Sequence, residues 1–301
     1  MSKPGKTGGR LAEVSHFFLS RVEDRDEEPS PGTAASTPVL RSRENTREAI
    51  WISSVVSGVP SAFLTANLAI ALSRRGQRVR IMDLENGNFT VPTALGVSPA
   101  YSELFRAYVL EGSITASTVE GPEGIEIVSI LPEGEATVSV GDDRMVLVNI
   151  PSDQDISASG GTAIVFARAD PQGLLAAYEW LKAAAEQGEV SALGAILSAP
   201  GGESAKDGFE HLSSACRRFL GRSFSYFGSF PSEASPSIHH SLSIGCPLTS
   251  LSPESEAAAA FTDMAERICV RTIPQKTAEP EIPAASSQAA RARPRPRVDV
   301  L

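Results

Sequence analysis

A repeated alternation of short apolar runs with longer amphipathic segments constrains the fold of this 301-residue chain more than any other feature. The clearest unit begins with a buried strand over residues 50–56, passes through a turn at 57–61 and a helix over 62–75, and returns as a strand over 78–83. Gly76 follows the helix at the position where a glycine commonly ends one. A strand, a helix and a second strand in this order are typical of a parallel sheet flanked by helices.

The same alternation continues to residue 270 and predicts the rest of the domain. We expect further strands over 125–130, 145–150, 163–167, 193–197 and 225–230, and helices over 101–111, 171–187, 206–220 and 253–268. The connection 131–144 contains two glycines and is short, which favours a hairpin or loop over a crossover helix. The predicted fold class is α/β, with a mostly parallel sheet flanked by helices over residues 49–270.

The segment before this domain has a different composition. Residues 1–48 contain one apolar island, in a stretch otherwise rich in charged residues, Pro, Ser and Thr. Within the island, helical spacing relates Leu11, Val14, Phe17 and Phe18. We therefore predict a mostly disordered, flexible extension with a short amphipathic helix near 11–20, which docks either on its own domain or on a partner protein.

The segment after the domain, residues 271–301, is rich in Pro, Ala and Ser. It ends in alternating Arg and Pro residues, which include Arg291, Arg293, Arg295 and Arg297. Prolines at alternate positions exclude a helix, so we expect a disordered, extended tail that cannot form an amphipathic membrane helix. The arginines belong either to a solvated linker or to a docking element for an acidic partner.

Charge and hydropathy exclude several classes of function. The chain carries 36 acidic and 27 basic side chains, and its net charge is -9. The first 48 residues are balanced and the tail is basic, so the acidic excess lies in the domain and argues against a nucleic-acid partner. No apolar run is long enough to span a membrane, and the beginning of the chain lacks the apolar stretch of a signal peptide. We expect a cytoplasmic protein without a membrane span.

Cysteine and histidine spacing predicts neither a disulfide framework nor a zinc site. The three cysteines, Cys216, Cys246 and Cys269, have no paired spacing, and the four histidines have no metal-ligand spacing. The sequence also offers no Ser/His/Asp or Cys/His arrangement. We therefore predict no metal site and no catalytic residue.

The segment from Ser54 to Ala69 resembles the nucleotide-binding turn of the MinD/ParA family of P-loop ATPases, which have a deviant Walker A motif. In that family the turn Lys-Gly-Gly-Val-Gly-Lys-Thr-Thr leads into a helix containing Thr-Ala-Asn-Leu-Ala, and residues 65–69 have those same five residues. Residues 74–85 are similar to the family's second strand. Residues 169–182 are similar to the segment after its fifth strand, and residues 227–231 to the turn over adenine.

This resemblance covers residues 49–270 and implies a P-loop NTPase-like fold of the MinD/ParA type. Residues 209–257 are most similar to the branch of FlhG/FleN regulators of flagellar number. In such relatives, ATP with Mg²⁺ drives dimerisation and attachment to a membrane or nucleoid.

The phosphate-binding motif of the family is degenerate here. Where the motif has Gly, Gly, Lys and Thr, this chain has Val55, Pro60, Ser61 and Ala62. Pro60 removes an N–H group and fixes φ, and Ser61 removes the cation that would face the phosphates. We therefore predict neither ATP hydrolysis nor tight nucleotide binding.

Other family positions have also changed. The additional Lys that reaches across the dimer falls on Val56, the magnesium-positioning Asp on Asn149, and the adenine-reading Asn on Ser198. Gly58 and Asp83 are retained, and of these only Asp83 can contact a metal ion or a water. The vestigial pocket is predicted to comprise Ser57, Gly58, Val59, Pro60, Ser61, Ala62, Asp83, Asn149, Ser198 and Pro231.

The combined prediction is a non-catalytic MinD/ParA-like protein that regulates or scaffolds through protein–protein contact. The resemblance implies a role in cell-pole, flagellar or other spatial organisation, with a catalytically intact relative or a second copy as partner and with no cofactor. Two alternatives stay open. One is an ATP- and Mg²⁺-dependent switch with atypical phosphate-binding residues, and the other is a binder of a different small ligand in the same cleft.

Overall fold

The computed structural model describes the domain with short gaps. The described residues are 49–85, 89–97, 116–130, 144–152, 160–187, 190–199, 204–231 and 235–272. The predicted helix over 101–111 lies outside them, as does most of the connection 131–144.

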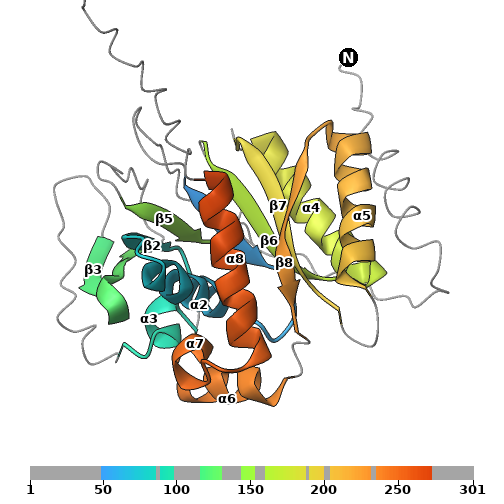
Figure 1. Ribbon diagram of the computed structural model, residues 1–301. Coiled ribbons are helices and arrows are strands. Elements are labelled where there is room, and N and C mark those ends of the chain that lie inside the picture. The colour runs from blue at the N-terminus through green and yellow to red at the C-terminus, as the bar shows by residue number, and fades with distance from the viewer. Residues whose placement is uncertain are drawn as a thin grey trace, which may run out of the picture.

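An eight-stranded sheet forms the centre of the molecule (Figure 1). Its spatial order is β3-β4-β2-β5-β1-β6-β7-β8. The β3–β4 pair is antiparallel and every other neighbouring pair is parallel, which confirms the predicted α/β class. The strands are β1 (Ile50–Ser54), β2 (Val79–Asp83), β3 (Ala116–Glu120), β4 (Glu126–Ile130), β5 (Met145–Asn149), β6 (Thr162–Arg168), β7 (Ala192–Ser198) and β8 (Phe224–Phe230).

Helices cover both faces of the sheet (Figure 1). On one face, α2 and α8 pack over a core that includes Ile50 and Ile52 of β1, and on the other, α4 and α5 pack over a core that includes Trp51. The alternation along β1 follows from the period of two in a strand. The helices are α2 (Ser61–Arg74), α3 (Val91–Ala94), η2 (Pro122–Gly124), α4 (Pro171–Gln187), α5 (Ala205–Ala215), the π-helical turn η4 (Cys216–Leu220), α6 (Pro236–Ile244), α7 (Leu248–Leu251) and α8 (Glu256–Thr272).

Helix α2 is buried on all sides over its first twelve residues, because the sheet, α8 and α7 surround it. Its neighbours include Phe261 of α8, whose ring lies 6.2 Å from that of Phe63 in an edge-to-face arrangement. The helix ends after Arg74, and Gly76 follows with φ of 79°. Both the helix and its glycine stop were predicted from the sequence, and both are confirmed.

The connection between β4 and β5 is not a hairpin, which was one of the two alternatives that the sequence left open. Both strands pair in parallel with β2, one on each side of it. The chain must therefore return across β2 before β5 begins, whereas a hairpin joins antiparallel neighbours. The hairpin alternative was wrong, because a short, glycine-containing connection can also span one intervening strand. The loop alternative falls on residues that lie mostly outside the described part of the chain.

Strand β3 was not predicted. Its sequence, Ala-Ser-Thr-Val-Glu, contains no apolar run, and the strand lies at the edge of the sheet beside β4. The predicted helix over 206–220 is present as α5 followed by the π-helical turn η4.

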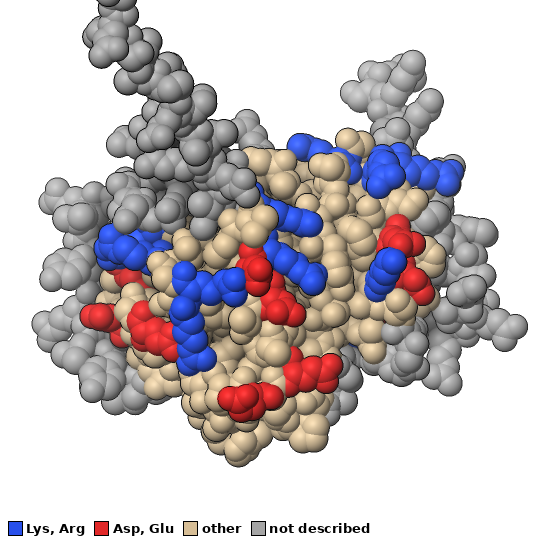
Figure 2. All heavy atoms as spheres, in the orientation of Figure 1, with Lys and Arg blue, Asp and Glu red and all other residues tan. Residues whose placement is uncertain are grey.

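The face of the molecule that contains α8 carries basic and acidic side chains in small separate groups rather than a field of one sign (Figure 2). No helix in the described part of the chain is long and apolar enough to cross a membrane.

Candidate functional site

The turn after β1 is closed by its own hydrogen bonds. The N–H of Val55 donates to the carbonyl of Phe166 at 3.0 Å, and the N–H of Val56 donates to Ser54 Oγ at 3.3 Å. The Ser54 hydroxyl donates to the carbonyl of Val59 at 2.7 Å, and the N–H of Val59 donates to the carbonyl of Val56 at 3.3 Å. Three amides of the turn thus point at acceptors within the protein, whereas a phosphate-binding turn directs its amides at the ligand.

The transition from the turn into α2 also differs from a phosphate site. Pro60 precedes the helix with extended backbone and makes no side-chain cap, and its carbonyl accepts the N–H of Phe63 at 3.1 Å. Ser61 and Ala62, which occupy the family's Lys and Thr positions, are 5% and 0% exposed. A helix N-terminus attracts an anion through its free N–H groups, and proline removes one of these.

The exposed part of the turn is small. Ser57 and Gly58 are exposed, whereas Val59 packs into the core at 2% exposure. Gly58 has φ of 81°, which L side chains rarely adopt, and a Cβ added there would meet nothing within 4 Å. The backbone conformation alone therefore explains why a glycine occupies this position, and no ligand is needed to explain it.

Asp83 and Asn149 meet at the carboxyl ends of neighbouring parallel strands. Asn149 Nδ2 donates to Asp83 Oδ1 at 2.7 Å, and Thr65 Oγ1 of α2 donates to Asn149 Oδ1 at 3.3 Å. The backbone N–H groups of Glu85 and Val91 donate to the two carboxylate oxygens of Asp83, at 3.2 and 2.8 Å. Asp83 is 1% exposed and Asn149 is 0% exposed, so the retained carboxylate is held inside the protein by its own neighbours.

Burial changes the acidity of this carboxylate. Desolvation raises the pKa of Asp83 from 3.8 to about 6, against the opposing effect of the Asn149 amide and the two backbone donors. A metal ion or a substrate cation would lower such a pKa.

The predicted pocket residues do not form one cluster. Ser198 ends β7 and Pro231 follows β8, whereas Asp83 ends β2. Four strand spacings separate β2 from β7, which is roughly 19 Å. Ser198 is fully buried, and its carbonyl accepts the N–H of Ala169 at 2.7 Å. These residues lie at the carboxyl edge of the sheet, where open α/β sheets bind ligands. Asp83 and Asn149, which are far apart in the sequence, are joined there by a hydrogen bond.

Two residues near this edge were missed by the sequence analysis. The sequence analysis used Thr65 only as part of the helix motif. Its hydrogen bond to Asn149 joins two residues that are far apart in the sequence, and no local sequence pattern reveals such a contact. Arg168 ends β6 two residues after Phe166, whose carbonyl accepts the N–H of Val55, so it is the basic residue nearest to the turn along that strand. Its Nε lies 2.5 Å from Asp170 Oδ2, which balances its charge.

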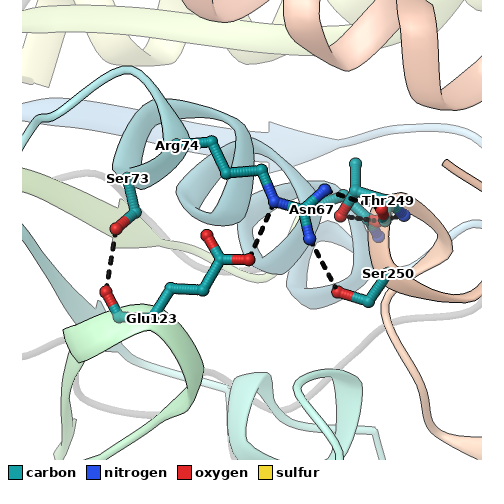
Figure 3. A network of polar contacts seen from close by, with 6 residues as sticks. All are labelled: Asn67, Ser73, Arg74, Glu123, Thr249 and Ser250. Atoms are coloured by element: carbon teal, nitrogen blue, oxygen red, sulfur yellow. Dashed lines mark hydrogen bonds and ion pairs between the residues drawn. The ribbon is translucent and has the colours of Figure 1, made fainter.

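The arginines at the end of α2 do not replace the missing lysines. Arg74 donates to Glu123 Oε1 and to the carbonyl of Thr249, both at 2.8 Å, and to Ser250 Oγ at 3.3 Å (Figure 3). In the same network, Asn67 Oδ1 accepts the Thr249 N–H at 3.0 Å. The network joins α2 to η2 and α7, at the far end of the helix from the turn, and Arg75 pairs with Glu266 of α8 at 3.1 Å. These residues have a structural role.

The predicted docking residues lie outside the described part of the chain. They are Leu11, Val14, Phe17, Phe18, Arg291, Arg293, Arg295 and Arg297. Among the residues that the structure describes, no three His, Cys, Asp or Glu side chains are grouped as a metal site.

No protein-family model matches the chain, and no curated protein matches it in sequence. Solved structures match it in fold. MinD, the cell division protein of Aquifex aeolicus, is 19% identical, with a TM-score of 0.52 over 75% of this chain and 98% of that chain. The MinC:MinD cell division protein complex of the same organism gives 19% identity and a TM-score of 0.50, over 76% and 98% of the two chains.

A third structure is the septum site-determining protein MinD of Pyrococcus horikoshii, complexed with Mg-ADP. It is 19% identical, with a TM-score of 0.51 over 73% of this chain and 95% of that chain. Identity at this level establishes the fold alone. The described chain therefore has the α/β fold of MinD, a mostly parallel sheet flanked by helices.

Proposed function

We propose that this chain is a degenerate member of the MinD/ParA family that binds no nucleotide and acts through protein–protein contact as a regulator or scaffold. The proposal rests on one observation above all: both oxygens of Asp83 already accept hydrogen bonds from the protein, from Asn149, Glu85 and Val91. The family resemblance implies a second carboxylate, which would help to position magnesium, at residue 149. In this chain the Asn149 amide occupies that position. A Mg²⁺ ion would have to displace these bonds.

The phosphate side of the site supports the same proposal. Ser61 and Val56 supply no cation, Ala62 supplies no hydroxyl, and Pro60 supplies no N–H. Loss of one charged partner of a buried charge typically costs about 2 to 5 kcal/mol, or roughly 30-fold to several thousandfold in affinity. Two absent lysines therefore argue against binding at cellular nucleotide concentrations.

The regulatory role is proposed from the fold and from the resemblance to the FlhG/FleN branch. Cell-pole, flagellar or other spatial organisation is the process in which such a protein would act. A scaffold of this kind keeps the sheet and its helices while the switch that ATP provides in relatives is lost. Its partner is either a catalytically intact relative or a second copy of this chain.

The experiment is isothermal titration of the full chain with Mg-ATP and with Mg-ADP, together with thermal melting in the same buffers. We expect no heat of binding and no shift in melting temperature up to millimolar nucleotide, because a ligand that binds only the folded state raises melting according to its occupancy. Saturable binding in the micromolar range would overturn the proposal.

A variant with the phosphate-binding motif restored tests whether these positions account for the absence of nucleotide binding. The quadruple substitution Val55→Gly, Pro60→Gly, Ser61→Lys and Ala62→Thr rebuilds the motif, and we expect it to gain measurable nucleotide binding. The matched control carries the other three substitutions and keeps Ser61, and we expect it to bind at least tenfold more weakly. If the unmodified chain binds instead, Arg168→Ala tests the basic residue at the end of β6 as the substitute cation.

A further inference from the structure

A groove runs along the open edge of the sheet, between the last strand and the last helix. Strand β8 ends the order of the described strands, and it lies between α8 and α5 in Figure 1. The groove has a volume of about 550 Å³ and is lined by Tyr226, Asp263, Glu266, Arg267, Val270 and Arg271. It is far from the turn after β1, because β6 and β7 lie between β1 and β8.

Five of these residues form one stripe along α8. They follow one another at intervals of three and one residues, which places them on a single face of the helix, and all are exposed. The acidic members, Asp263 and Glu266, come first, and the basic members, Arg267 and Arg271, come last. In Figure 2, acidic and basic side chains lie next to one another near the middle of this face.

An apolar contact accompanies the charges. Val270 is 62% exposed, and it is one of two large hydrophobic residues that the described chain leaves exposed. The guanidinium of Arg267 lies 5.5 Å from the centre of the Tyr226 ring, and that of Arg271 lies 5.2 Å from the Phe227 ring. The two cations are thus held over the aromatic residues of β8, which reduces the entropy that a partner would have to remove from them.

From this arrangement we infer that the α8 stripe is a self-association surface, on which a second copy of this chain docks with its own α8 antiparallel. A two-fold axis near Arg267 brings Asp263 of each copy opposite Arg271 of the other. These two contacts are about 12 Å apart along the helix, at 1.5 Å per residue. Val270 of each copy then lies opposite the stretch between Asp263 and Arg267 of the other.

A second copy fits this surface because the surface is complementary to itself. A two-fold interface uses the same patch on both subunits. Because this patch has acidic residues at one end and basic residues at the other, an antiparallel arrangement places the acidic end of each copy against the basic end of the other. A uniformly acidic or basic partner would leave half of the stripe facing a like charge. This dimer forms without nucleotide, since its residues are separate from the turn and from Asp83.

The test is a charge swap, read by sedimentation equilibrium of the full chain at micromolar concentrations. We expect the unmodified chain to be a dimer with and without Mg-ATP. Asp263→Arg and Arg271→Glu should each raise the dimer dissociation constant by about tenfold or more, because each change acts twice across the axis and turns attraction into repulsion. The double variant should return to within about threefold of the unmodified chain, since each contact again joins opposite charges.

Matched controls on α4 separate this surface from a general effect of charge. Glu179→Arg and Lys182→Glu make the same changes on a helix of the opposite face, and we expect both to leave the dissociation constant unchanged. A monomeric unmodified chain overturns the inference, as does a dimer that ignores the single reversals or one that the double variant fails to restore. Melting temperatures identify any variant that is unfolded, and the nucleotide titration is independent of all these outcomes.

Discussion

Asp83 makes the free energy of unfolding depend on pH in the direction opposite to that of most carboxylates, whose pKa values are lowered on folding. Its folded-state pKa is about 6 and lies above the ordinary value of 3.8, because burial disfavours the charged form. The folded state therefore binds a proton more tightly than the unfolded state, and the resulting stability is fully present below about pH 4 and lost as the pH rises through 6. A shift of this size corresponds to about 3 kcal/mol.

We expect the unmodified chain to lose about 2 kcal/mol more free energy of unfolding between pH 4 and pH 7 than the Asp83→Asn variant does, because the unfolded carboxyl is already partly ionised at pH 4. Urea denaturation at the two pH values measures both chains, and Glu179→Gln at an exposed position of α4 is the control. Carbon NMR titration of the Asp83 carboxyl reports its pKa directly. Parallel pH profiles for the two chains would contradict the assignment.

At the scale of an element, two of the hydrogen bonds that close the turn after β1 share one hydroxyl. Ser54 Oγ accepts the Val56 N–H and donates to the Val59 carbonyl, and its side chain is buried. Ser54→Ala leaves both backbone groups without this partner, which typically costs about 1 to 3 kcal/mol. Ser57→Ala, in the same turn but exposed, should change the free energy of unfolding by less than about 0.5 kcal/mol. Equal effects in urea denaturation would show that the turn is not closed in this way.

The network at the end of α2 allows a comparison of buried and exposed contacts within one element. Asn67 is fully buried, accepts the N–H and the hydroxyl of Thr249, and donates to the carbonyl of Phe63 at 2.8 Å. Asn67→Ala should therefore cost about 2 to 3 kcal/mol. The Arg74 side chain is 43% exposed, so screening reduces its ion pair, and Arg74→Ala should cost less than about 1 kcal/mol. Thermal melting of the two variants checks the order, and a larger loss for Arg74→Ala would contradict it.

For the whole molecule, the parallel sheet and most of its elements were predictable because buried strands and surrounded helices leave strong apolar patterns. The patterns of β1, α2 and β2 are examples, and Gly76 marks the stop. Strand β3 was not predicted, because an edge strand needs apolar residues on one side only and because β3 has just five residues. The hairpin error arose because strand order depends on which strand lies between β4 and β5, and local sequence contains no such information.

The candidate site was predictable in its composition but not in its orientation. The sequence places Asp83 at the end of a strand, and that position is confirmed. Whether its oxygens face solvent or the protein depends on Asn149, which is 66 residues away along the chain, and on the backbone of Val91. The role of Thr65 depends on the same long-range contact.

The central position of β1 sets an order of events during synthesis. Both strands that flank it come much later in the chain, β5 about 95 residues on and β6 later still. Until residue 149 has left the ribosome, β1 has no partner on either side, and its second side stays unpaired until residue 168 has followed. Such long-range pairing slows folding and exposes an aggregation-prone intermediate. A nascent chain of this protein therefore exposes an unpaired edge of β1 until β6 has been synthesised.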